Sequence, residues 1–134
     1  MKRMREDRGV AAVEFAILLP VLILLMLGIF EFGRLFNEQV TVTNAAREAA
    51  RVMAIADDPS AAAAAAVHAA APSLNPGLTS GEVSLNITSC KSNPGKSVVA
   101  TVTYPAQLLF PGFWKWATGS TLTLTGSGQM ICGG

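Results

Sequence analysis

The sequence predicts an α+β protein in which a long N-terminal transmembrane helix continues as a stalk into a small exported domain. A charge-poor apolar run covers residues 10–33, and helical spacing of apolar residues continues to about residue 56. After residue 82 the apolar residues alternate with polar ones, which is typical of strands. We therefore expect a short second helix and a small antiparallel sheet of about three strands.

The apolar run is long enough to cross a membrane. Residues 10–33 carry two charges, Glu14 and Glu31. A helix of this length spans about 36 Å, against about 30 Å for the hydrocarbon core. A buried core helix is the first alternative, but a domain this small cannot enclose a helix that is apolar all round. A cleavable secretory signal is the second, but bulky Phe32, Leu35 and Phe36 stand where such a signal needs small residues.

Basic residues predict the orientation of this helix. Four precede it and three follow it: Lys2, Arg3, Arg5 and Arg8, then Arg34, Arg47 and Arg51. The positive-inside rule then places the N-terminus in the cytoplasm and the C-terminal domain outside. The predicted organisation is a cytoplasmic leader at 1–9, a transmembrane helix at 10–33, and an exported stalk and domain at 34–134. The net charge of +1 gives no basis for nucleic-acid binding.

Glu14 stands inside the apolar run, where an ionised group is costly, so a function is expected of it. One interpretation is that its side chain extends back to the membrane interface. The other is that it pairs with an amine. Cleavage after Gly9 would give Val10 a new amino group one helical turn from Glu14, and a neighbouring subunit could supply the same group.

The N-terminal third carries three recognisable strings: RGVAAVEF at 8–15, EFGR at 31–34 and NAAREAAR at 44–51. Together they resemble the TadE-like family of tight-adherence pilus pseudopilins. The resemblance implies that a prepilin peptidase cuts after Gly9 on the cytoplasmic side, leaving Val10 as the mature N-terminus. It also implies that Glu14 and Phe15 act in subunit assembly and registration. The implied partners are other pilin-like subunits and the pilus assembly platform, at the bacterial inner (cytoplasmic) membrane.

Beyond the membrane run, an alanine-rich stripe continues the helix to about Ala56. The stripe could pack on a partner helix or cover the protein's own sheet. We assign Glu38 and Arg47 to its polar face. We assign Asp57-Asp58 to helix capping, with Pro59 in the first helical position of an alanine helix over 60–71. In this helix His68 is expected to be a bystander.

Three segments are predicted to be strands: 83–88, 97–104 and 120–131. A turn at 91–96 joins the first two. Leu122, Leu124 and Met130 are expected on the apolar face of the third. Between the last two strands, an aromatic segment contains Phe110, Phe113, Trp114 and Trp116, and it could bind a partner, rest on the membrane, or plug the core.

Two cysteines, Cys90 and Cys132, are expected at the ends of the first and third strands. Outside the cytoplasm a disulfide between them is permitted, and closing a loop of this size stabilises a domain by about 3–4 kcal/mol. Two distant cysteines and one histidine do not make a zinc site.

Catalytic motifs are absent from the sequence: it has no G-x-S-x-G, no metal-ligand spacing and no phosphate loop, so neither an enzyme nor a cofactor is expected. The leading hypothesis is a minor pilin-like protein in pilus assembly. The alternative is an anchored, never-processed binding module of the cell envelope, in which Gly9 and Glu14 have no special role.

Overall fold

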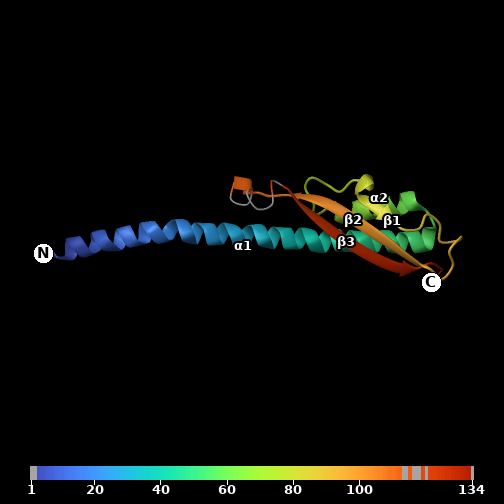
Figure 1. Ribbon diagram of the computed structural model, residues 1–134, viewed down its shortest axis with the longest axis horizontal. Coiled ribbons are helices and arrows are strands. Elements are labelled where there is room, and N and C mark those ends of the chain that lie inside the picture. Colours follow the sequence, from blue (N-terminus) through green and yellow to red (C-terminus); the bar gives the residue numbers. More distant parts are fainter. Residues whose placement is uncertain (1–2, 113–114, 116–118, 120, 134) are drawn as a thin grey trace. The chain divides into compact units, whose positions relative to one another are not determined.

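The computed structural model describes residues 3–112, 115, 119 and 121–133. The chain forms two compact units, Met1–Arg34 and Leu35–Gly134. The elements in chain order are α1 (Arg3–Ala56), α2 (Pro59–Ala70), the 3-10 helix η1 (Ser80–Glu82), β1 (Val83–Leu85), β2 (Ser97–Gln107) and β3 (Thr121–Ile131), as labelled in Figure 1. The predicted class, a long apolar helix, a short helix and a three-stranded antiparallel sheet, is confirmed.

The first unit consists of the N-terminal part of α1. The helix is 54 residues long, continues through Pro20, and begins seven positions before the predicted start at Val10. Large apolar side chains from Val10 to Phe30 are exposed, which excludes a buried core helix. Among the described residues, one helix is long and apolar enough to span a membrane, and this is that helix. Its length and exposed apolar surface are consistent with a single-pass membrane anchor.

The sheet of the second unit has the order β1-β2-β3, with both pairs antiparallel. The first strand ends at Leu85, three residues earlier than predicted, because a side chain takes over its pairing. The Asn86 Oδ1 accepts the Val99 N–H at 2.6 Å, and its Nδ2 donates to the Ser97 carbonyl at 3.2 Å. The second strand is longer than predicted and continues to Gln107.

The alanine stripe of α1 covers the protein's own sheet. Four alanines of this stripe are fully buried: Ala45, Ala46, Ala49 and Ala50. A Cβ at Gly126 would lie 2.7 Å from the Thr43 Cα, and one at Gly128 would lie 2.4 Å from the Arg47 Cα. The helix backbone therefore lies directly on β3, and only glycine fits at these two strand positions.

The second helix begins as the local sequence predicts. Asp58 is its N-cap and accepts the N–H groups of Ser60 at 2.8 Å and Ala61 at 3.3 Å, with Pro59 in the first turn. His68 is exposed. Helix α2 packs on the core through small residues, Ala62, Ala66 and Ala70.

Core placement differs from the predictions at two positions. Met130 is 40% exposed rather than buried, because Met53, Val98 and the cysteines fill that end of the core. Glu38, assigned to the polar face of the stalk, is only 4% exposed, because it lies on the side of α1 that faces the sheet. Among the described residues, Tyr104 is the largest fully buried side chain, and its hydroxyl donates to the Pro76 carbonyl at 2.8 Å.

The aromatic segment before β3 is described only in part. Phe110 is 37% exposed. Phe113, Trp114 and Trp116 lie outside the described residues, so the alternatives for this segment stay open.

Candidate functional site

The predicted processing site lies in the first turns of α1. Gly9 and Val10 are both helical, and Val10 is 59% exposed. A Cβ at Gly9 would meet no atom within 4 Å. Local opening of the helix costs less at Gly9 than it would at an alanine, since glycine is about 1 kcal/mol less favourable than alanine in a helix.

Glu14 and Phe15 lie on the exposed surface of the same helix. Val10 and Glu14 are four positions apart, so they share one face and are separated by about 6 Å along the axis. A new N-terminus at Val10 would be an amine next to this carboxylate. It would also leave Glu14 near the unsatisfied N–H groups of a helix start, where negative charge is favoured.

An ion pair marks the other end of the apolar run. The Arg34 guanidinium donates to the Glu31 carboxylate at 2.9 Å, at a spacing of three residues. Pairing lowers the cost of placing both charges at the edge of an apolar segment. The sequence analysis did not predict this pair, although the i,i+3 spacing of the two residues indicates it.

Two further interactions lie outside the membrane helix, an ion pair in the stalk and a disulfide. In the stalk, the Arg51 guanidinium donates to Glu48 at 2.6 and 2.9 Å, and its hydrogen bonds lower the pKa of the Glu48 carboxyl. At the far end of the second unit, Cys90 and Cys132 form a disulfide with a Cα–Cα distance of 5.1 Å. Cys90 does not end a strand as predicted. It lies in the loop after β1, because pairing along β2 stops at Asn86.

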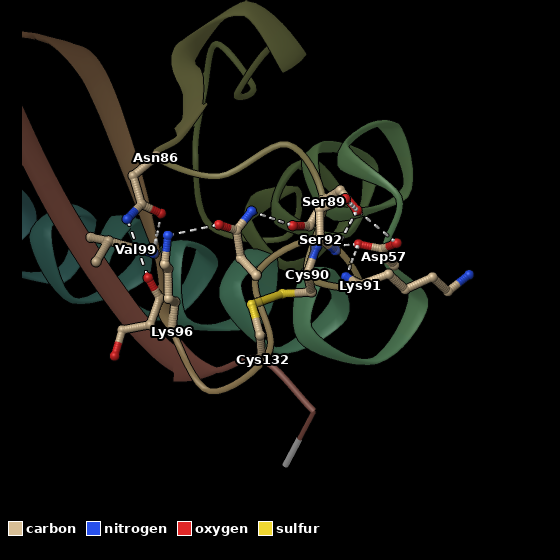
Figure 2. The surroundings of a disulfide bond; sticks show 11 residues. Asp57, Asn86, Ser89, Cys90, Lys91, Ser92, Lys96, Val99 and Cys132 are labelled. Carbon is tan, nitrogen blue, oxygen red and sulfur yellow. Dashed lines mark hydrogen bonds between the residues drawn. A yellow bond between two sulfur atoms is a disulfide. The ribbon is translucent and has the colours of Figure 1, made fainter.

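Asp57 ties this loop to the end of α1, as Figure 2 shows. The residue takes a left-handed conformation with φ of 54°, which stops the helix. Its carboxylate accepts the backbone N–H of Cys90, the Lys91 N–H at 3.3 Å and the Ser89 hydroxyl at 3.2 Å. Desolvation opposes ionisation, but the hydrogen bonds from the Cys90 N–H, the Lys91 N–H and the Ser89 hydroxyl, together with the Lys91 charge, hold the pKa of Asp57 below its usual value.

The assignment of Asp57 and Asp58 to the end of one helix and the cap of the next is confirmed, since the left-handed Asp57 ends α1 and its N–H donates to the Met53 carbonyl at 3.0 Å. The sequence did not predict that the Asp57 carboxylate would bind a loop more than thirty positions away in the chain. No local signal marks such a partner. Asp58 does cap α2, and the hydrogen bonds from Ser60 lower the pKa of Asp58.

Comparison with known proteins bears on the N-terminal segment. Residues 9–51 match the family model described as TadE-like protein. This segment is TadE-like. The match confirms the resemblance predicted from the sequence, and TadE-like proteins are a pilus-associated structural family. No curated protein and no solved structure matches the chain.

The TadE-like segment contains Gly9, Val10, Glu14 and Phe15, but neither Asp57 nor the disulfide. The membrane run and the part of α1 that covers β3 therefore belong to the family pattern. In the part of the chain that the structure describes, no three His, Cys, Asp or Glu side chains group as metal ligands do.

Proposed function

We propose that this chain is a minor pilin-like subunit, a pseudopilin, that serves assembly of a tight-adherence, type IV-like pilus. The observation that carries the proposal is the TadE-like segment on an exposed apolar helix, with Glu14 one turn after Gly9-Val10. The chain is anchored in the bacterial inner membrane with its N-terminus in the cytoplasm. The second unit lies on the periplasmic or extracellular side, where its disulfide is stable.

Processing by a prepilin peptidase is the first step of the proposed function. The matched segment begins at Gly9, the residue before the proposed scissile bond. Cleavage would remove residues 1–9 and expose the Val10 amine to Glu14 of the same chain or of a neighbouring subunit. An amine–carboxylate pair between subunits would set their axial register. Sliding one subunit along the axis of the other would separate the two charges and leave each unpaired in lipid, which is costly.

A substitution at Glu14 tests the assembly step. We expect Glu14→Gln to insert in the membrane normally but to be lost from the assembled pilus fraction or from crosslinked complexes with other subunits. The matched control is Glu48→Gln, which neutralises a stalk carboxylate outside the membrane run. It should assemble like the native chain.

The same experiment separates the alternative function. An unprocessed, anchored binding module of the envelope would assemble no subunits through Glu14. Its Glu14→Gln variant would behave like the Glu48→Gln control, or would insert slightly better because a charge is removed from the apolar run.

A further inference from the structure

Both cysteines of the disulfide are buried in the second unit. Cys90 is 5% exposed and Cys132 is 2% exposed, and the two pack in one cluster with Met53, Ala62 and Val98. A thiolate that cleaves a disulfide must contact one of its sulfur atoms. The closed structure therefore protects this disulfide, and its reduction requires that part of the second unit moves.

Cys132 is held by the sheet. Its N–H donates to the Lys96 carbonyl at 2.9 Å, and its carbonyl accepts the Gly95 N–H at 3.1 Å. These two bonds continue the β2–β3 ladder past its last pair, Ser97 with Ile131. Moving Cys132 would therefore break the end of the sheet.

Cys90 lies outside this ladder, in a turn of residues 89–93 that we call the Cys90 turn. Inside the turn, the Asn93 N–H donates to the Cys90 carbonyl at 2.9 Å, and the Asn93 Nδ2 donates to the Ser89 carbonyl at 2.9 Å. Three hydrogen bonds connect the turn to the Asp57 carboxylate, two from backbone N–H groups and one from the Ser89 hydroxyl (Figure 2). Because its internal bonds are separate from these three, the turn can move as one body when the bonds to Asp57 break.

Movement of the Cys90 turn leaves the strands paired. Before the turn, the Asn86 side chain stays bonded to the β2 backbone. After it, the Lys96 carbonyl stays bonded to the Cys132 N–H. The turn is thus a short segment between two fixed points, and lifting it away from Met53 uncovers the sulfur atoms without unfolding the sheet.

We propose that the Cys90–Cys132 disulfide is a gated site of thiol–disulfide exchange with a dithiol, and that the Asp57 carboxylate is the latch that keeps it closed. Hydrogen bonds to a carboxylate are stronger than those between neutral groups, so Asp57 determines how often the Cys90 turn opens. In the open form, one thiolate of the dithiol attacks a cysteine sulfur, the S–S bond breaks, and the other cysteine leaves as a thiolate. The second thiolate of the dithiol then displaces the bound cysteine. The protein gains two thiols, which take up the two protons of the dithiol, and the dithiol is oxidised to a disulfide.

The rate at which dithiothreitol reduces the full chain in detergent micelles tests the latch. Released thiols are alkylated and counted by mass, at dithiothreitol concentrations where the rate is proportional to the reagent and so reports the open fraction. The variant is Asp57→Gly. Asp57 has a φ of 54°, a conformation that suits glycine, so this change removes the carboxylate without straining the end of α1. We expect Asp57→Gly to be reduced about tenfold faster or more, because three hydrogen bonds to the turn are lost.

Two control variants separate the latch from charge and from global stability. Asp58→Gly removes the same charge one position away, where glycine is a tolerated N-cap, so it reports any attraction of the anionic thiolate. Its reduction rate should stay within about threefold of the native rate. Gly126→Ala pushes β3 against the Thr43 backbone and destabilises the second unit as a whole. It should speed amide exchange in β2 but leave the reduction rate within about threefold, because local opening keeps β3 on α1.

Four results would overturn the proposal. Asp57→Gly could be reduced at the native rate, or Asp58→Gly could be reduced as fast as Asp57→Gly. Gly126→Ala could speed reduction as much as it speeds β2 exchange, which would show that reduction follows global unfolding. Finally, the native chain could be reduced as fast as the chain unfolded in urea, which would show that the disulfide is not protected. The proposal does not use Gly9 or Glu14, so its outcome is independent of the proposed function.

Discussion

Among the described glycines, Gly128 leaves the least room for a Cβ, and it gives the sharpest prediction of stability. A Cβ there would lie 2.4 Å from the Arg47 Cα, 2.5 Å from its N and 2.6 Å from the Ala46 carbonyl carbon. Ordinary contact begins at 3.4 Å, so Gly128→Ala requires a separation of 3.4 − 2.4 = 1.0 Å. All three atoms are helix backbone, so no rotamer change can relieve the clash.

We therefore expect Gly128→Ala to lower the free energy of unfolding of the second unit by about 3 kcal/mol, the upper end for overpacking. The same arithmetic at Gly126 gives 3.4 − 2.7 = 0.7 Å and a smaller loss of about 2 kcal/mol. Gly81→Ala is the control, because a Cβ there meets nothing within 4 Å and should change stability by less than about 0.5 kcal/mol.

Native-state amide exchange of β2 and β3 measures these differences in the full chain with the disulfide intact. The expected order of destabilisation is Gly128→Ala, then Gly126→Ala, then Gly81→Ala. If Gly128→Ala costs no more than Gly81→Ala, α1 does not lie directly on β3 and the account of the core is wrong.

Three further predictions concern the second unit. Reducing the disulfide between Cys90 and Cys132 should lower its stability by about 3–4 kcal/mol, measured by amide exchange with and without reductant. The pKa of Asp57 is lowered in the folded state, so its contribution is present above the unfolded pKa of about 3.9 and is lost as pH falls through the folded pKa. Asp57→Asn should therefore flatten the acid side of the stability profile and speed exchange at Cys90. Tyr104→Phe should lower the free energy of unfolding by about 0.5–1.5 kcal/mol, measured by thermal unfolding, because it removes the hydroxyl that donates to the Pro76 carbonyl.

Local chemistry explains which parts of the fold could be predicted. The end of α1 at Ala56 follows from Asp57 and the start of α2 from Asp58-Pro59, and both capping roles depend on neighbouring residues alone. The apolar run predicts the membrane helix by length and composition. Alternation predicts three strands, although not where they end.

Long-range packing explains what could not be predicted. The early end of β1 depends on Asn86, whose side chain takes the place of the β1 backbone in pairing with β2. From the sequence alone, Gly126 and Gly128 would only weaken the predicted strand. The close approach of the α1 backbone explains why both positions are glycine. Asp57 ends α1 as its neighbours predict, but no neighbouring residue indicates that its carboxylate binds a distant loop.

The candidate site was predicted from a motif rather than from packing. Its residues lie on one exposed stretch of α1, and only Val10 and Glu14 share a face by their spacing. No tertiary contact of the second unit is needed to place them on the helix. Their roles in processing and registration stay predictions.

The N-terminal sequence of the membrane-bound protein, isolated from cells that contain a prepilin peptidase, tests the central claim most directly. Cleavage between Gly9 and Val10 predicts a mature chain that begins at Val10, together with an unprocessed chain when the peptidase is absent. A protein that still begins at Met1 in peptidase-containing cells would contradict the pilin-like function.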